Sequence, residues 1–132
     1  MTSKWVVNKF GGTSLADARG YRTAGRIVRG HRSDGTRVAA VVSAMSGVTD
    51  SLIELVTLAA NQNDSYLAKL RDLKEKHLET MAQLGLSEEQ AQPLAKNLAS
   101  DFKNIEEVLR GVWITGLPSE SIREFVSGHG EL

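Results

Sequence analysis

Apolar residues follow two different periods along the chain, and this change of period predicts both strands and helices. Residues 5–10 form a short run rich in β-branched and aromatic side chains that ends at a glycine pair, which predicts a strand and a tight turn. Residues 37–42, mostly Val and Ala, predict a second strand that is buried on both faces. Between them, helical spacing predicts a helix that begins near Asp17 and ends at residues 31–35. The apolar face of this helix consists of Ala18, Tyr21, Ala24, Ile27 and Val28.

The order strand, helix, strand implies a parallel pair of strands. A helix of this length requires a right-handed crossover, so the two strands are expected to be neighbours in an α/β sheet with both faces covered. The loops that follow the strands, residues 11–15 and 44–49, then converge at one edge of the sheet. Ligands of open α/β sheets bind at that edge, so candidate chemistry is expected in these two loops.

The rest of the chain has the pattern of helices separated by polar breaks. Helical spacing predicts a helix over 49–60 and a longer one over 65–84. Ser87 and Gln90 fit a capping box that begins a third helix, in which Pro93 lies near the first turns or at a kink. A separate fourth helix and a short fifth helix follow. The apolar positions of the first helix are Leu52, Ile53, Val56 and Ala60, and those of the second are Leu67, Leu70, Leu73, Leu78, Met81 and Leu84. No apolar face is assigned to the third helix. The apolar positions of the fourth are Phe102, Ile105, Val108, Leu109 and Val112, and those of the fifth are Ile122, Phe125 and Val126.

Several apolar and aromatic residues are interpreted as packing residues rather than as functional ones. The stripe from Leu67 to Met81 is expected to face the core, and Trp5 and Trp113 are expected to be buried anchors. His77 lies near this stripe and is interpreted as a packing histidine. Two strands are few for so many helices, because a parallel sheet usually needs several strands to form a covered layer. We therefore expect either that the chain is part of a larger domain or that another chain supplies the missing strands.

Composition excludes several classes of function. The chain has 132 residues, of which 41% are hydrophobic and 24% charged, as expected for one globular domain or part of one. Its 16 basic and 16 acidic side chains are interspersed, which argues against a nucleic-acid partner. No apolar segment approaches the roughly 18 residues of a membrane span and no signal peptide is recognised, so a cytoplasmic protein without a membrane partner is predicted. The absence of cysteine excludes disulfides, thiolate nucleophiles and Cys-based metal sites.

The first loop carries residues suited to binding phosphate. Residues 9–14 (Lys-Phe-Gly-Gly-Thr-Ser) lie between a strand and a helix, where glycines let backbone N–H groups approach an anion and Lys9 adds a positive charge. The segment matches neither the P-loop nor the dinucleotide-binding fingerprint. A purely structural role fits equally well, in which the glycine pair makes a tight turn and Thr13 or Ser14 caps the helix.

The second loop and the end of the chain offer candidates for binding an amino acid. Residues 43–49 (Ser-Ala-Met-Ser-Gly-Val-Thr) combine small side chains with three hydroxyl groups and can hold a carboxylate. The alternative is a flexible loop in which Thr49 is the N-cap of the next helix. Glu131 can hold an ammonium group in the same cleft, although a glutamate near a chain terminus is usually solvated.

Taken together, these segments resemble the aspartate kinases. VVNKFGGTS (6–14) resembles the amino-terminal signature of that family, VVSAMSGVTD (41–50) its second motif, and GHGEL (128–132) its glutamate-bearing third motif, with Gly128 where the family often has serine. The resemblance implies an α/β fold, the carbamate kinase-like three-layer α/β/α sandwich of amino-acid kinases, here as a helix-rich partial domain with few parallel strands. It implies that residues 1–132 are the amino-terminal part of a catalytic domain, without the ATP-binding part and the ACT regulatory domains.

The resemblance also implies an activity and a site. Aspartate kinases transfer the γ-phosphoryl group of ATP, with Mg²⁺ bound mainly through the nucleotide phosphates, to the side-chain carboxylate of L-aspartate. The product, 4-phospho-L-aspartate, begins the synthesis of lysine, threonine, methionine and diaminopimelate, and the full-length enzyme is expected to be a homo-oligomer. By this similarity Lys9 is catalytic. The expected nucleotide-binding residues are Lys9, Phe10, Gly11, Gly12, Thr13 and Ser14, the expected aspartate-binding residues are Ser43, Ala44, Thr49 and Glu131, and no metal-ligating residue is expected.

Two other hypotheses stay open at this point. One is another amino-acid kinase, acting on glutamate, acetylglutamate or a nucleotide, against which the second and third motifs argue. The other is a non-catalytic helical interaction module that binds a partner through the face from Leu67 to Leu84. Because the resemblance implies that part of the ATP site is missing, the isolated chain is expected to have little or no turnover.

Overall fold

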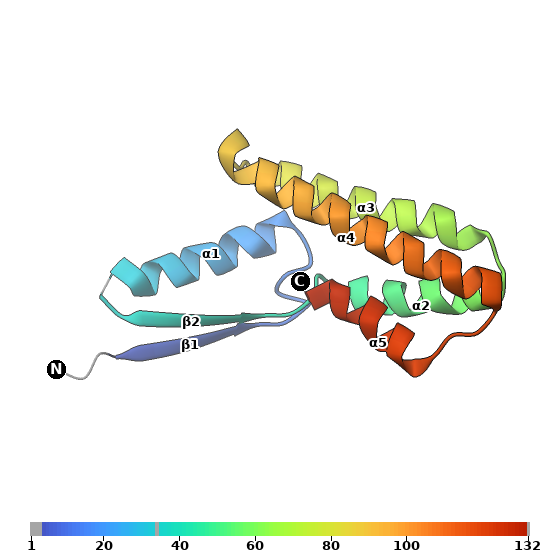
Figure 1. Ribbon diagram of the computed structural model, residues 1–132. Coiled ribbons are helices and arrows are strands. Elements are labelled where there is room, and N and C mark those ends of the chain that lie inside the picture. The colour runs from blue at the N-terminus through green and yellow to red at the C-terminus, as the bar shows by residue number, and fades with distance from the viewer. Residues whose placement is uncertain (1–3, 34, 132) are drawn as a thin grey trace.

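Figure 1 shows the computed structural model, which describes residues 4–33 and 35–131, as a two-stranded sheet beside a bundle of helices. β1 (Trp5–Phe10) and β2 (Arg37–Val42) pair in parallel and in register along their whole length. α1 (Ala18–Ser33) connects them and lies along one face of the sheet (Figure 1). The predicted parallel unit of strand, helix and strand is therefore confirmed, while Asp34, in the predicted break, lies outside the described residues.

The bundle consists of the elements that follow β2. These are α2 (Val48–Ala60), α3 (Ser65–Gln83), α4 (Glu88–Thr115), α5 (Glu120–Gly128) and the short 3-10 helix η1 (His129–Glu131). α2 lies in the middle of the bundle and packs against α3, α4 and α5. After α5, η1 brings the end of the chain back to the carboxyl ends of the two strands (Figure 1).

α4 is one helix of 28 residues where the sequence predicted two. It begins with the predicted capping box, in which Ser87 Oγ accepts from the N–H of Gln90 at 3.4 Å and Gln90 Oε1 accepts from the N–H of Ser87 at 3.2 Å. Pro93 is exposed in the second turn, where its missing N–H removes a single helical hydrogen bond. The buried face of α4 consists of Phe102, Ile105, Leu109 and Val112. The predicted position of Pro93 near the first turns is confirmed, whereas the predicted separation of a third helix from a fourth is wrong, because packing of this face against the bundle favours one continuous helix.

The main hydrophobic core lies inside the bundle. Its most deeply buried side chains, from α2, α4 and α5, are Leu55, Val56, Ala59, Leu109 and Val126. Trp113 is half-buried against this core.

The predicted apolar stripe of α3 is only partly correct. Leu70 and Leu73 are buried, whereas Leu67 and Leu78 are 43% and 37% exposed. The face of α3 that meets the bundle follows Tyr66, Leu70 and Leu73, and Leu67 is one position, about 100° of helical rotation, away from it. Three other predicted core residues are exposed for the same reason, because each lies to one side of the buried face of its own helix: Ile27, Ile53 and Phe125.

A second, smaller core lies between α1 and the sheet, and it consists of Phe10, Leu15 and Ala24. The opposite face of the sheet is open, with Trp5 58%, Val7 68% and Val41 52% exposed. The predictions that β2 is buried on both faces and that Trp5 is buried are therefore wrong, because α1 covers one face and no described element covers the other. Trp5 packs instead beneath the guanidinium group of Arg37, which lies 5.6 Å from the ring centroid.

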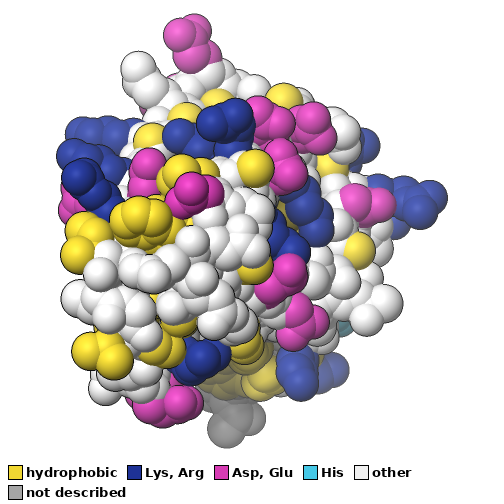
Figure 2. Space-filling model, turned by 90° about the vertical axis from the view of Figure 1, so that its right-hand side faces the viewer, with side chains coloured by type: hydrophobic (Ala, Val, Ile, Leu, Met, Phe, Trp, Pro, Cys, Tyr) yellow, Lys and Arg dark blue, Asp and Glu magenta, His cyan; other side chains and the backbone are white. Residues whose placement is uncertain are grey.

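The surface of the bundle carries charges of both signs. Figure 2 shows basic and acidic side chains interspersed over this face, with apolar side chains between them. One ion pair, between Lys69 and Glu54, joins α3 to α2. In the part of the chain that the structure describes, no helix is long and apolar enough to cross a membrane.

Tyr66 makes the stability of the core dependent on pH. Burial, reinforced by the negative charges of Glu106 and Asp64 and opposed by Arg110, raises the pKa of this phenol above its ordinary value of 10.0. The folded state therefore favours the neutral phenol. The resulting contribution to the free energy of unfolding is fully present below pH 10.0 and is lost as the pH rises through the raised pKa. We expect the Tm to fall more steeply between about pH 9 and about pH 11 than it does in Tyr66→Phe. Identical slopes in thermal unfolding would contradict this account.

Candidate functional site

The carboxyl ends of β1 and β2 place the two predicted loops side by side. The N–H of Ser43 donates to the carbonyl oxygen of Phe10 at 3.1 Å, so the second loop begins in contact with the end of β1. A Cβ atom on Gly12 would lie 3.4 Å from the carbonyl oxygen of Ala44, which shows how closely the two loops approach. The predicted convergence of the loops at this edge of the sheet is confirmed.

The first loop is a tight turn in which two backbone N–H groups are free to donate hydrogen bonds. Ser14 and Leu15 donate their N–H groups back to the carbonyl oxygen of Gly11 at 2.9 and 3.1 Å and close the turn. Leu15 is buried beneath it and anchors it to the core. The N–H groups of Gly12 and Thr13 have no acceptor among residues 4–33 and 35–131. Backbone N–H groups left free at a turn form a suitable binding site for an anion.

The second loop leads directly into the positive end of α2. Its last residue, Gly47, has a φ of 78°, in the left-handed region that residues with a Cβ rarely adopt. Gly47 is the N-cap, so the interpretation of Thr49 as the N-cap is wrong, and Thr49 lies inside the first turn. Within the described residues, the N–H groups of Thr49 and Asp50 have no acceptor. A helix N-terminus with free N–H groups attracts a carboxylate.

Glu131 reaches the same edge from the far end of the chain. Its Oε2 accepts a hydrogen bond from the N–H of Ala44 at 3.1 Å, across 87 positions of sequence. Its Oε1 makes no hydrogen bond within the described part of the chain, so that oxygen is available to a ligand. The hydroxyl of Ser43 donates to the carbonyl oxygen of Ala44 at 3.0 Å and holds the adjoining peptide group.

These elements surround an open cavity of about 280 Å³. Six of the ten predicted site residues line it: Gly12, Thr13, Ser43, Ala44, Thr49 and Glu131. Its wall is completed by four residues that the sequence analysis did not assign to the site: Met45, Ser46, Gly47 and Asp50. Asp50 adds a second carboxylate to the cavity, and its place at the end of the second motif is the signal that could have identified it. The cavity thus combines helix N–H groups, hydroxyl groups and two carboxylates, which suits a small zwitterion.

The other four predicted residues, Lys9, Phe10, Gly11 and Ser14, do not line this cavity. The side chain of Phe10 is buried in the core beneath α1. Lys9 precedes it on the strand and is exposed at the end of β1, and it makes no ion pair with any residue in the described ranges. Its ammonium group is therefore free to approach an anion at the sheet edge. Leu132, the last residue of the third motif, lies outside the described residues.

No group of three or more histidine, aspartate or glutamate side chains suited to holding a metal ion occurs within the described residues.

Comparison with known proteins identifies the family of this chain. Residues 4–113 match the sequence profile of the amino acid kinase family. The chain belongs to the amino acid kinase family.

The relatives of this amino acid kinase chain include two plant proteins. Over 128 residues it is 38% identical to bifunctional aspartokinase/homoserine dehydrogenase 2, chloroplastic, of Arabidopsis thaliana. Over the same length it is 40% identical to bifunctional aspartokinase/homoserine dehydrogenase 1, chloroplastic, of Zea mays. Each match covers 97% of this chain and 14% of the relative, so the chain spans a small part of their length.

Solved structures show the same fold for this member of the family. Aspartokinase III of E. coli in complex with lysine and aspartate (T-state) matches with a TM-score of 0.75 and 22% identity, over 96% of this chain and 26% of that one. The same protein in complex with aspartate and ADP (R-state) matches with a TM-score of 0.72 and 23% identity, over 97% and 26%. The predicted aspartokinase-like fold, helix-rich and with few parallel strands, is confirmed.

Proposed function

We propose that this amino acid kinase chain forms the amino-terminal part of a catalytic domain that transfers the γ-phosphoryl group of ATP to the side-chain carboxylate of L-aspartate. The observation that carries the proposal is the hydrogen bond between Glu131 and Ala44, which joins the second and third motifs around one cavity. Phosphoryl transfer between two anions requires positioning and charge neutralisation rather than a covalent nucleophile on the protein. Residues of the two loops and of η1 can supply both the positioning and the charge neutralisation.

Glu131 is the proposed partner of the substrate ammonium group. The N–H of Ala44 fixes one carboxylate oxygen and leaves the other free, so the charge is oriented before the substrate arrives. Asp50 adds negative charge in the same wall. In the same cavity, the free N–H and the hydroxyl group of Thr49 suit a substrate carboxylate. The opposite signs of these two groups would hold an amino acid in a single orientation.

Residues 9–14 are the proposed contact with the nucleotide phosphates. The free N–H groups of Gly12 and Thr13 provide donors, and the unpaired ammonium group of Lys9 provides a positive charge for the transferring phosphoryl group. Mg²⁺ bound through the nucleotide phosphates would neutralise part of their charge. Nucleotide use is supported by the solved complex of E. coli aspartokinase III with aspartate and ADP.

The proposed reaction needs more protein than this chain. The chain spans 14% of the plant relatives and 26% of the E. coli protein, so the remainder of the ATP site is proposed to lie outside it. We expect the isolated chain to bind L-aspartate with little or no turnover. In the whole enzyme, which we propose to be a homo-oligomer, the product is 4-phospho-L-aspartate, the first intermediate toward lysine, threonine, methionine and diaminopimelate.

Binding of L-aspartate to the chain tests the role of Glu131. Glu131→Gln keeps an oxygen that accepts from the N–H of Ala44 but loses the charge that faces the substrate ammonium. We expect this variant to bind isotopically labelled L-aspartate about tenfold more weakly, a loss of about 1.4 kcal/mol. The measurement is a saturation titration by equilibrium dialysis.

The matched control is Glu120→Gln, which changes an exposed glutamate in the first turn of α5, outside the cavity. It is expected to bind L-aspartate as the unmodified chain does. L-glutamate, which is one methylene longer, is expected to compete poorly. Equal affinity in Glu131→Gln, or equal affinity for glutamate, would contradict the proposed substrate site.

A further inference from the structure

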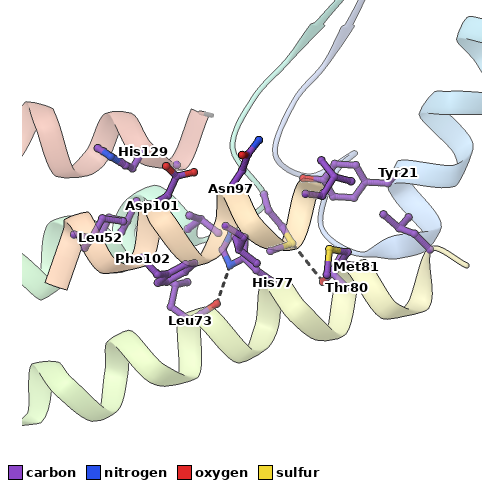
Figure 3. Close-up of a pocket in the computed structure, with 17 residues that line it drawn as sticks. Tyr21, Leu52, Leu73, His77, Thr80, Met81, Asn97, Asp101, Phe102 and His129 are labelled. Atoms are coloured by element: carbon purple, nitrogen blue, oxygen red, sulfur yellow. Dashed lines mark hydrogen bonds between the residues drawn. The ribbon is translucent and has the colours of Figure 1, made fainter. Parts of the chain in front are cut away.

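A second cavity, which shares Met45 with the candidate site, lies between the helices (Figure 3). Its volume is about 410 Å³, and its walls come from α1, α2, α3, α4 and η1. Volumes of about 300–1,000 Å³ are typical of sites for small molecules. Most of its lining is apolar, including Leu52, Leu73, Met81, Leu98, Phe102 and Ile105.

Several polar groups of this cavity can accept a hydrogen bond from a ligand. Asp101 is half-buried in α4, and its carboxylate has no hydrogen bond or ion pair with a described residue. Nδ1 of His77 lies 2.7 Å from the carbonyl oxygen of Leu73. Nδ1 of His129 lies 2.9 Å from the carbonyl oxygen of Phe125. Because a carbonyl oxygen only accepts, Nδ1 of each ring carries the proton, which leaves Nε2 of the neutral ring as an acceptor.

The arrangement of these groups favours a positively charged ligand. Figure 3 shows Asp101 and Asn97 projecting from one side of α4, while Phe102 projects from the other side, toward α3. No lysine or arginine is among the described residues that line the cavity, so a ligand carboxylate or phosphate would lack the permanently charged partner that these side chains provide. An ammonium group, in contrast, would pair with the carboxylate of Asp101. A free amino acid is therefore disfavoured and an amine without a carboxylate is favoured.

We propose that this cavity binds a small molecule with an apolar body and one cationic amine, and that the bound molecule acts on the loop of the candidate site. Met45 lines both cavities and is buried between them, and the hydroxyl of Thr80 lies 3.7 Å from its sulfur. Gly130 lines this cavity and is followed directly by Glu131, which lines the other. A ligand that contacts Met45 therefore changes the environment of the Ala44 amide. The inference goes beyond the proposed function, since binding here requires no phosphoryl transfer.

Three probes of nearly equal size test the charge preference. Phenethylamine, 2-phenylethanol and phenylacetate share an aromatic body and carry a positive, a zero and a negative charge near neutral pH. Each is titrated into the full 132-residue chain and followed by the amide signals in ¹H–¹⁵N NMR spectra. We expect the amine to bind about tenfold more tightly than the alcohol, and phenylacetate not to bind. Saturation with the amine is expected to shift the signal of Ala44 as well as those of residues that line the cavity.

Two variants separate this site from non-specific binding. Asp101→Asn keeps the shape of the side chain and removes its charge, so the amine is expected to bind no better than the alcohol. Asp72→Asn, at an exposed aspartate of α3 outside the cavity, is expected to leave the preference unchanged. Retained dispersion of the NMR signals shows that each variant is folded. Equal binding of the three probes, an unchanged preference in Asp101→Asn, or an unshifted Ala44 signal at saturation would overturn the proposal.

Discussion

Replacing Lys9 by alanine is expected to lower kcat for phosphoryl transfer by on the order of 10²–10³-fold. Lys9 is exposed at the carboxyl end of β1 and pairs with no acidic residue in the described ranges, so its removal takes away a charge without disturbing the core. The assay requires a complete kinase. A suitable protein is a chimaera in which these 132 residues replace the matching segment of the Zea mays relative, which is 40% identical over 128 residues.

The matched control for this prediction is Lys4→Ala, which removes an exposed lysine immediately before the same strand. Its kcat is expected to equal that of the unmodified chimaera. Lys9→Arg keeps the positive charge and is expected to retain more activity than Lys9→Ala. If Lys9→Ala and Lys4→Ala have the same kcat, the catalytic role of Lys9 is wrong.

Gly20→Ala is expected to lower the free energy of unfolding by about 3 kcal/mol, whereas Gly25→Ala in the same helix is expected to raise it by about 0.5–1 kcal/mol. A Cβ atom on Gly20 would lie 2.2 Å from the carbonyl oxygen of Ser14, while nothing lies within 4 Å of one on Gly25. The N–H of Gly20 also donates to Oδ1 of Asp17 at 2.9 Å, which holds the start of α1 in place. The first loop and α1 are therefore packed backbone against backbone at Gly20.

Urea unfolding of the two glycine variants measures this difference directly. Because the clash at Gly20 involves the backbone of Ser14, relief requires the first loop to move. Gly20→Ala is therefore expected also to change the amide signals of Gly12 and Thr13, which Gly25→Ala is expected to leave in place. Equal stability of the two variants would show that the close approach at Gly20 is not maintained in solution.

The elements that were predicted correctly are those with local signals. The glycine pair that ends β1 and the capping box of Ser87 and Gln90 act within a few residues, so the sequence pattern is sufficient to recognise them. The continuity of α4 through Pro93 depends on packing of a face 9 to 19 positions further along, from Phe102 to Val112, which local rules do not contain. The exposure of Val41 was not predictable either, because burial of a strand depends on what covers the sheet.

The candidate site shows the same division. Convergence of the two loops follows from the parallel pairing of β1 and β2, a topological rule that needs only the order of elements. The contact of Glu131 with Ala44 spans 87 positions, so no local rule predicts it, although Glu131 was a candidate for this cleft and the resemblance to aspartate kinases strengthened that assignment. The alternative of a helical interaction module loses part of its basis, because Leu70 and Leu73 are buried within the bundle.

The central claim is that this chain supplies the phosphate loop and the aspartate site of a kinase. The measurement that tests it most directly is formation of an acyl phosphate by the chimaera, trapped with hydroxylamine and followed together with release of ADP. The account predicts a hydroxamate that requires ATP, Mg²⁺ and L-aspartate, that is not formed by the isolated chain, and that is lost in Lys9→Ala and Glu131→Ala. A folded chimaera that forms no aspartate-dependent hydroxamate, or that forms it equally well in both variants, would contradict the claim.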